Sequence, residues 1–267
     1  MTGASTGIGQ AAARELARLG FRVFGGVRSE ADAEAARRIG LSPVRLDVTD
    51  EPQVQRVRQR LEDESDGRVD VLVNNAGIGV AGPLESVEVE ALRRQLDVNL
   101  LGVHRMVRAL APMLIAAGGR IVNISSISGR IGYPYLGAYA ASKHALEGYS
   151  DALRRELSPH GVRVVVVQPG VIDTPIWGKS ALSAEQVAAL PERYRREAGR
   201  VLSGLDRTGL RAPSPERVAR VIGRAATAAR PRARYALPLG TRIQARLVPL
   251  VPEALIDWAA DRALGRR

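Results

Sequence analysis

The chain has 267 residues, of which 45% are hydrophobic, enough for the core of one large α/β domain. It contains no cysteine, which excludes disulfides, thiolate catalysis and cysteine-ligated zinc. Its three histidines lie too far apart for a spacing motif, so we expect no bound metal. It shows neither a basic-then-apolar leader nor an uncharged apolar run of the ~20 residues that span a bilayer, which predicts a cytoplasmic protein.

The charge is unevenly distributed along the chain. Residues 1–192 hold 22 basic and 22 acidic side chains, so the net charge of +11 lies in residues 193–267, where 17 arginines face six carboxylates. This segment lacks the interleaved aromatic residues that stack on bases. We therefore interpret it as a solvated basic surface and expect no nucleic-acid partner.

Helical and strand-like stretches alternate along the chain, and the strand-like runs are apolar enough to be buried on both faces of a sheet. We expect strands at residues 22–27, 44–47, 69–74, 120–125, 162–168 and 233–237. We expect helices at residues 9–19, 30–39, 51–64, 87–117, 138–157 and 215–229. This order predicts a three-layer α/β fold of the Rossmann type, with a doubly wound parallel sheet between helices.

Two segments of this single domain, residues 1–267, depart from the alternation. Residues 171–212 lose periodicity and accumulate Pro, Gly, Ser and Arg, and an irregular insert of this length is typical of a substrate lid. Residues 241–267 are basic and amphipathic, a pattern compatible with peripheral contact to an anionic membrane. Pro249 and Pro252 interrupt a long helix there, which favours a segment that covers the pocket or a subunit contact.

The sequence carries no full first strand ahead of its glycine turn, because only Met1 precedes Thr2-Gly3. We therefore expect a truncated first strand, with unpaired backbone groups on its two neighbours. A start codon misassigned at a valine would explain this beginning. A chain extended by about ten residues, roughly one strand and its lead-in, is then expected to be the more stable.

The glycine-rich turn is the first candidate site, and it reads Thr2-Gly3-Ala4-Ser5-Thr6-Gly7-Ile8-Gly9. Glycine permits a tight turn and a close approach of a pyrophosphate, whose charge then lies at the positive end of the following helix. By itself such a loop does not distinguish a dinucleotide site from an ordinary glycine turn. The candidate cofactor contacts are Gly3, Ser5, Gly7, Ile8 and Gly9.

The residues after the second strand of the expected pattern indicate which cofactor binds. NAD-binding proteins carry an acidic residue there, whereas this chain reads Gly26-Val27-Arg28-Ser29. Arg28 can pair with a 2′-phosphate, with Ser29 adding a hydroxyl, so we expect NADP rather than NAD. A surface arginine is the alternative. Asp47 and Val48 are candidates to hold the adenine, although Asp47 would serve equally to cap the next turn.

The strongest candidate for catalysis is Tyr139 with Lys143, four residues apart in a predicted helix and thus on one face. The ammonium would lower the pKa of the phenol, normally near 10, so that it exchanges protons near neutral pH. Ser126 follows a buried strand and is placed to hydrogen-bond a substrate carbonyl. Taken alone, a Tyr and a Lys one helical turn apart are also compatible with ordinary packing.

Together these motifs resemble the short-chain dehydrogenase/reductase family over residues 1–229. The resemblance implies hydride transfer between a nicotinamide and a carbonyl or alcohol carbon, with Tyr139 as acid or base. Ser126 would polarise the substrate oxygen, and Lys143 would bind the nicotinamide ribose. Asn99 would kink its helix and anchor a water in a proton relay. The implied cofactor contacts are Asn75, Ala76 and Gly77 at the adenosine ribose, Pro169, Gly170 and Thr174 at the carboxamide, and Tyr139 and Lys143.

The resemblance is greatest to the retinol and hydroxysteroid dehydrogenase-like branch, which implies a lipophilic substrate and a homo-oligomer. Seven residues form either an apolar pocket or the packing of the lid: Ile127, Tyr133, Tyr135, Ile172, Ile176, Trp177 and Leu182. The alternative function is a catalytically silent, dinucleotide-binding regulator or scaffold. A silent protein has no chemical need for the complete set Asn99, Ser126, Tyr139 and Lys143, which favours the enzyme.

Overall fold

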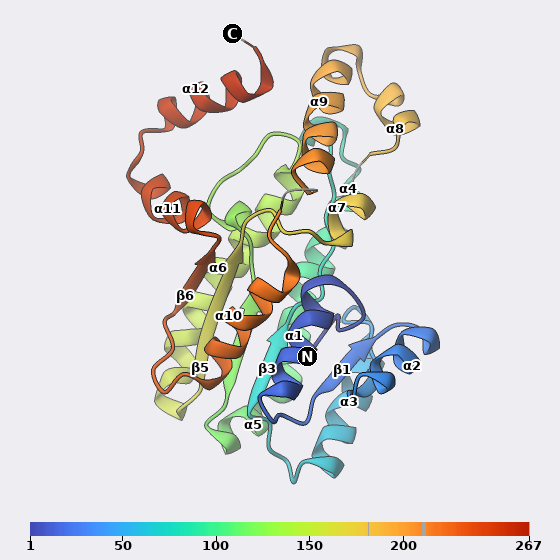
Figure 1. Cartoon of the computed structure of the whole chain (residues 1–267), viewed down its shortest axis with the longest axis vertical. Coiled ribbons are helices and arrows are strands. Elements are labelled where there is room, and N and C mark those ends of the chain that lie inside the picture. The colour runs from blue at the N-terminus through green and yellow to red at the C-terminus, as the bar shows by residue number, and fades with distance from the viewer. Residues whose placement is uncertain (181, 210–211, 267) are drawn as a thin grey trace.

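Parallel strands form the middle layer of the computed structural model, which describes residues 1–180, 182–209 and 212–266 (Figure 1). The strands run in the order β2-β1 and β3-β4-β5-β6, and every hydrogen-bonded pair is parallel. Each lies within two residues of its predicted range: β1 (Phe24–Val27), β2 (Ser42–Arg45), β3 (Val71–Asn74), β4 (Arg120–Ile124), β5 (Arg163–Pro169) and β6 (Arg234–Leu237).

The N-terminal residues lie between β1 and β3, in the place of the first strand. The amide of Gly26 donates to the carbonyl of Met1 at 2.8 Å, and the amide of Ala4 donates to Gly26 at 2.9 Å. On the other side, the amide of Thr2 donates to the carbonyl of Val73 at 2.9 Å. These bonds pair backbone groups on both neighbours, so the expectation that both edges are left unpaired is wrong at these positions.

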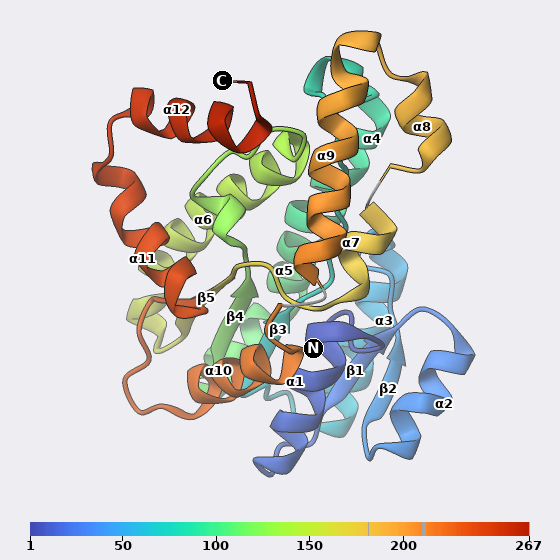
Figure 2. The same cartoon turned by 45° about the horizontal axis from the view of Figure 1, so that its top comes forward.

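Helices cover both faces of the sheet (Figure 2). Successive strand residues point to opposite faces, so Val122 packs in one core while Ile121 packs in the other. The first face is covered by α1 (Gly7–Arg18), α2 (Glu30–Arg38) and α10 (Pro215–Thr227). The second is covered by α3 (Glu51–Glu64), α5 (Gly102–Ala117) and α6 (Gly137–Leu157). The predicted three-layer, doubly wound fold is thus confirmed.

The single helix predicted at residues 87–117 is divided in the structure. It consists of α4 (Val89–Leu96), a π-helical turn at Asp97–Leu101 and then α5. By length and composition alone, residues 89–117 would be able to cross a membrane, but buried core residues such as Met106, Leu110 and Leu114 make up one face of α5. That face packs against the sheet, as in the core helix of a globular domain.

The described part of residues 171–212 is mostly helical, so the prediction of an irregular insert is wrong. It contains α7 (Pro175–Ser180), α8 (Ala184–Ala189) and α9 (Glu192–Gly209); positions 181, 210 and 211 lie outside the described residues. A capping box between Ser183 and Gln186 begins α8. Ala198 of α9 packs in a small separate core with Tyr135 and Leu264. These long-range contacts compensate for the weak helical pattern of the segment.

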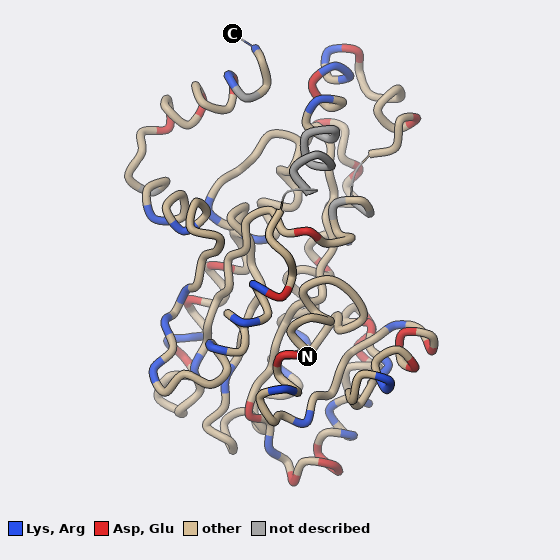
Figure 3. The backbone as a smooth tube through the Cα atoms, viewed as in Figure 1, with Lys and Arg blue, Asp and Glu red and all other residues tan. Residues whose placement is uncertain are grey.

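The C-terminal residues form two helices, α11 (Leu239–Leu247) and α12 (Glu253–Leu264), separated by a 3-10 turn at Val248–Leu250. The break lies at the two prolines, as predicted. Figure 3 shows the arginines of this part of the chain along α10, β6 and α11, whereas acidic and basic residues alternate on α2 and α3. Four further arginines of residues 193–267 lie on α9, so the basic residues are not confined to the β6 side: Arg193, Arg195, Arg196 and Arg200.

Candidate active site

A cleft of about 540 Å³ opens at the carboxyl ends of the parallel strands, the edge at which such sheets bind ligands. It brings together the candidate catalytic and cofactor-binding residues except Asn99, which lies buried behind it. The candidates that line it are Gly3, Ser5, Gly7, Ile8, Gly9, Arg28, Asp47, Val48, Asn75, Ala76, Gly77, Ser126, Tyr139, Lys143, Pro169, Gly170 and Thr174.

The glycine turn forms one wall of the cleft and has a backbone that only glycine adopts easily. Gly3 and Gly7 have φ angles of +64° and +54°, and a Cβ on Gly9 would lie 1.8 Å from the carbonyl oxygen of Gly3. Thr6 is the N-cap residue of α1, and its side chain makes no capping hydrogen bond. The first backbone amides of this helix therefore remain available to another acceptor. This backbone fits an anionic group such as a pyrophosphate.

Thr2 joins this turn to the loop after β3, a role that the sequence reasoning did not assign. Its hydroxyl accepts hydrogen bonds from the amides of Asn75 at 3.0 Å and Ala76 at 2.9 Å. The Asn75 side chain in turn donates to the carbonyls of Thr2 at 3.2 Å and Gly3 at 2.9 Å. The motif that begins with this threonine was the available signal, but the partner loop lies 73 residues away.

At the end of β1, Arg28 is exposed on the wall of the cleft and forms no ion pair with a carboxylate in the described part of the chain. Ser29 instead caps α2, accepting from the amide of Asp32 at 3.1 Å and donating to its carboxylate at 2.7 Å. The Asp47 carboxylate accepts from the amide and the hydroxyl of Thr49, at 2.9 and 2.7 Å. The turn-capping alternative for Asp47 is therefore present, although the residue also lines the cleft.

Tyr139 and Lys143 lie on one face of α6, both buried at the base of the cleft. The Nζ atom of Lys143 is 5.7 Å from the centre of the Tyr139 ring and donates to the carbonyl of Ile124 at 2.8 Å. Ser126, which follows β4, forms a hydrogen bond with the phenol of Tyr139. The three side chains predicted to act together therefore meet.

Electrostatics at this trio differ from the expectation. Burial raises the pKa of Tyr139 to about 12, and the hydrogen bond with Ser126 lowers it only in part. Burial also lowers the pKa of Lys143 to about 8, while the charge of Glu147 raises it. The expected lowering of the phenol pKa by Lys143 is therefore not found: desolvation raises this pKa, and the hydrogen bond with Ser126 is what opposes the rise.

Asn99 lies in the π-helical turn and is 1% exposed. Its side chain accepts from the amide of Ile78 at 2.9 Å and donates to the Ile78 carbonyl at 3.0 Å. It also donates to the hydroxyl of Ser142 at 3.0 Å, which itself donates to the carbonyl of Tyr139 at 2.7 Å. These contacts link the loop after β3 to the helix that carries the tyrosine.

The far end of the cleft is formed by the segment after β5. A Cβ on Gly170 would lie 2.2 Å from the hydroxyl of the buried Thr241 in α11, so the chain must be bare of a side chain there. Thr174 lies against the glycine turn, with its Cβ 3.3 Å from the position of a Cβ on Gly7. The two ends of the predicted cofactor site are thus in contact.

Of the residues predicted to form an apolar pocket or to pack the lid, only Ile172 and Ile176 line the cleft. Tyr133 and Leu182 pack together, and Tyr135 packs against α9, which matches the packing alternative. The side chain of Trp177 lies outside the described residues. The hydroxyl of Tyr135 donates to Glu197 of α9 at 2.7 Å, so this tyrosine tethers the helical segment to the domain.

Comparison with known proteins agrees with this geometry. The family described as short chain dehydrogenase matches residues 1–185. The uncharacterized oxidoreductase YusZ of Bacillus subtilis strain 168 is 35% identical over 270 residues, covering 97% of this chain and 94% of that protein. The NADPH-dependent 3-dehydrocapnine reductase of Ornithobacterium rhinotracheale is 33% identical, covering 96% and 93%. The 3-ketodihydrosphingosine reductase of Bacteroides thetaiotaomicron is 42% identical over 177 residues, covering 65% of this chain and 63% of that protein.

Solved structures agree with the sequence comparisons. A short chain dehydrogenase from Burkholderia cenocepacia J2315, in complex with NADP, superposes with a TM-score of 0.74 at 27% identity, covering 95% of this chain and 93% of that one. In this chain one cleft holds the glycine turn together with the buried Tyr139 and Lys143. This chain belongs to the short-chain dehydrogenase/reductase family of oxidoreductases.

Proposed function

We propose that this protein is an NADP-dependent oxidoreductase that transfers a hydride between the nicotinamide and the carbonyl or alcohol carbon of an apolar substrate. The observation that carries the proposal is the placement of Ser126, Tyr139 and Lys143 at the base of the cleft that also contains the glycine turn. A proton donor, a hydrogen-bond donor and a cation beside a dinucleotide cradle are the groups that carbonyl reduction needs.

NADP rather than NAD is favoured by the exposed guanidinium of Arg28 on the cleft wall. A 2′-phosphate is the group that such a cation pairs with best, through short charge-assisted hydrogen bonds. The relative from Ornithobacterium rhinotracheale is named as NADPH-dependent, and the Burkholderia cenocepacia structure contains NADP. When bound, the reduced nicotinamide supplies the hydride.

The residues of this chain supply the proton chemistry. In reduction, Tyr139 donates its phenolic proton to the substrate oxygen, and Ser126 polarises that oxygen by a hydrogen bond. Lys143 stabilises the resulting phenolate by its charge, which lowers the cost of proton transfer from a phenol whose pKa burial holds near 12. Asn99 acts behind them by fixing the loop after β3 against α6.

An apolar ketone or alcohol is the proposed substrate class. Ile172 and Ile176 line the cleft, and α7 to α9 cover this end of the domain as the proposed lid. One relative is named as a reductase of 3-ketodihydrosphingosine, which supports a keto substrate and the direction of reduction. Residues 1–267 act as one domain in this proposal.

The test is NADPH oxidation with a panel of aliphatic, retinoid and steroid carbonyl compounds. We expect Tyr139→Phe to lose about 10²- to 10⁴-fold in kcat while NADPH binding, followed by fluorescence, is retained. Tyr133→Phe is the matched control, because this tyrosine packs outside the cleft and should leave turnover unchanged. Binding of NADPH without turnover of any carbonyl or alcohol would support the silent regulator or scaffold instead.

We also infer that the protein binds anionic membranes through α11 and α12. The polarity of α11 is the reverse of that of an ordinary surface helix. Thr241 is buried, whereas Leu239, Ile243 and Leu247 face solvent. Arg242 and Arg246 are also exposed and lie beside this apolar row on the helix surface. Such a face inserts apolar side chains into a bilayer while the arginines reach lipid phosphates. The exposed apolar residues of both helices and the turn between them are Leu239, Ile243, Leu247, Leu250, Leu255 and Trp258.

The charges of the two helices favour α11 as the main contact with the membrane. It carries two arginines and no acid, whereas α12 carries Arg262 together with Glu253, Asp257 and Asp261. Phosphatidylcholine vesicles with added phosphatidylglycerol should therefore bind the protein at low salt and release it at high salt. Flotation of the double variant Leu247→Asp with Leu250→Asp should fail on these vesicles.

The exposed Val89 of α4 provides the control, because Val89→Asp adds the same charge on another element. It should float like the wild-type protein. If the double variant converts a dimer to a monomer in light scattering and vesicles bind neither protein, the surface contacts a second copy of the chain and the membrane proposal is wrong.

A further inference from the structure

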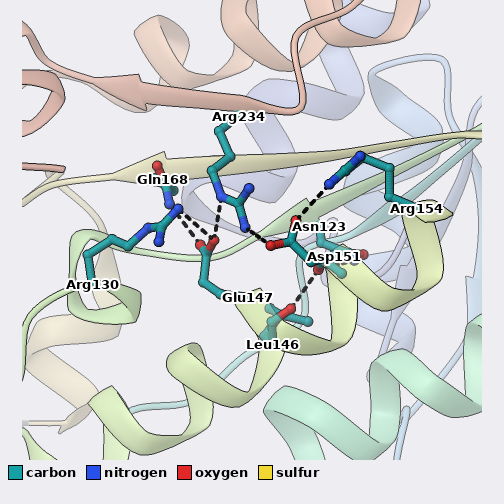
Figure 4. A network of polar contacts seen from close by, with 9 residues as sticks. Asn123, Arg130, Leu146, Glu147, Asp151, Arg154, Gln168 and Arg234 are labelled. Carbon is teal, nitrogen blue, oxygen red and sulfur yellow. Dashed lines mark hydrogen bonds and ion pairs between the residues drawn. The ribbon is translucent and has the colours of Figure 1, made fainter. Parts of the chain in front are cut away.

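A buried polar cluster lies one helical turn beyond Lys143 (Figure 4). Its centre is Glu147 of α6, whose side chain is 6% exposed. One carboxylate oxygen accepts from the Nε2 of Gln168 in β5 at 3.0 Å, and the other accepts from the Nε of Arg234 in β6 at 2.9 Å. Arg130 lies 3.9 Å from the same carboxylate. One amide and two guanidinium groups thus surround this buried carboxylate.

The cluster lies directly behind the catalytic residues. Residues 143 and 147 are separated by one helical turn and share a face of α6. A Cβ on Gly129, three residues after Ser126, would lie 3.0 Å from the Cγ of Glu147 and 3.1 Å from the carbonyl of Lys143. The serine loop is thus packed on both residues, which leaves no room for water between this part of the loop and the helix.

Two other acidic residues that line the cleft with Lys143 are held by partners of their own. Asp97, on the opposite wall of the cleft, pairs with Arg105 at 2.7 Å, and Asp47 is held by Thr49. The remaining titratable or charged groups that face this region from the packed elements are Tyr139, Glu147, Arg130 and Arg234 beside the helix, and Arg28 and Arg94 across the cleft. Among these groups, Glu147 is the acid on the lysine's own helix face.

We propose that Glu147 is a positioning residue that keeps Lys143 protonated, and that Arg234 sets how strongly it does so. The proposal rests on the proposed function, in which the charge of Lys143 stabilises the phenolate. Burial alone moves the pKa of Lys143 toward neutrality, and the carboxylate opposes that shift. The competing explanation is that the cluster only joins β5 and β6 to α6.

Two charge-removing variants separate these explanations, because they have opposite expected effects. Glu147→Gln removes the negative charge, so the pKa of Lys143 should fall by about one unit, the lower end of the range for a nearby opposite charge. Arg234→Gln removes a positive charge and releases Glu147 from its partner, so the pKa of Lys143 should rise. A loss of packing alone would not produce shifts of opposite sign.

Asp151 provides the matched control. It lies one turn further along α6 and also pairs with Arg234, at 2.9 Å. Asp151→Asn therefore disturbs the same arginine but removes a charge two turns from Lys143, and the lysine titration should stay in place. An equal shift in this variant and in Glu147→Gln would mean that only the integrity of the cluster matters, and it would overturn the proposal.

The lysine can be titrated directly, because the chain contains only two, Lys143 and Lys179. Protein labelled with ¹³C at the lysine Cε gives two resonances, and Lys179→Arg assigns them. Their chemical shifts, followed from pH 6 to pH 11 without cofactor, report the pKa of Lys143 in each variant independently of turnover. An unchanged midpoint in a folded Glu147→Gln or Arg234→Gln protein rules the proposal out.

Measurements of turnover then test whether the cluster affects the reaction. The alkaline limb of the kcat profile should move to lower pH in Glu147→Gln and to higher pH in Arg234→Gln, with little change at pH 6. If the lysine midpoints shift but no carbonyl compound is reduced by the wild-type protein, the function proposal fails while the electrostatic role stands. If turnover is present but its alkaline limb does not follow the midpoints, the role of Glu147 in the reaction is wrong.

Discussion

The hydroxyl of Thr2 accepts a hydrogen bond from the amide of Asn75 at 3.0 Å, which joins the glycine turn to the loop after β3. A second amide, that of Ala76, donates to the same oxygen at 2.9 Å. Thr2 is 2% exposed, so no solvent is at hand to replace it. The shape of the cleft wall formed by the glycine turn therefore depends on one small polar side chain.

We expect Thr2→Val to lower the free energy of unfolding by about 1 to 3 kcal/mol, because the two amides lose their acceptor in a buried site. NADPH should also bind less tightly. Urea unfolding checks the first effect and fluorescence titration the second. Thr6→Val is the control, since Thr6 is exposed and makes no capping bond. Equal stability of the two variants would contradict the prediction.

The charge of Lys143 destabilises the folded protein at neutral pH. Its pKa falls from 10.5 in the unfolded chain to about 8 in the folded one, so the unfolded state binds the proton more tightly. Stability is therefore lost as the pH falls from about 10.5 through about 8. Lys143→Met removes this penalty, and at pH 7 the free energy of unfolding should rise by about 1 to 3 kcal/mol, even though the hydrogen bond to Ile124 is lost.

The gain in Lys143→Met should shrink as the pH rises from about 8 toward 10.5, because the folded protein has then lost the lysine proton and the unfolded chain begins to lose it. Thermal unfolding at pH 7, 9 and 10.5 measures it, while turnover should be lost at each pH. A variant less stable than wild type at pH 7, or a difference that does not vary with pH, would show that the ammonium is not desolvated as the structure indicates.

Arg28 is expected to select the cofactor. Arg28→Ser should weaken NADPH binding about ten- to one-hundredfold, the loss of one charge-assisted contact, and leave NADH binding unchanged. Arg37→Ser, an exposed arginine on α2 outside the cleft, is the control. Fluorescence titration with both cofactors measures the ratio. An equal loss for NADPH and NADH would mean that Arg28 does not contact the 2′-phosphate.

Much of the fold was predictable because its signals are local. Apolar runs such as the one in β5 indicate strands buried on both faces, and the glycine turn indicates where α1 begins. The candidate residues follow strand ends, and parallel strands place their carboxyl ends at one edge. That rule is sufficient to gather almost all of them into one cleft.

Other features were not predictable from local pattern. The helices α7 to α9 are stabilised by contacts with Tyr135 and with α12, which lie far from them in sequence. The bond from Thr2 to Asn75 and the ion pair between Glu147 and Arg234 each join positions more than 70 residues apart. No spacing within one element indicates such partners.

By itself, the sequence determined the order of strands and helices around the parallel sheet, the family and the side chains proposed to carry the chemistry, because periodicity, glycine positions and motif spacing are properties of neighbouring residues. Only the tertiary structure decided the state of those side chains. Burial raises the pKa of Tyr139 and lowers that of Lys143, and a carboxylate held by a distant arginine opposes the second shift. Desolvation and charge pairing depend on which segments pack together, and local pattern does not encode that packing.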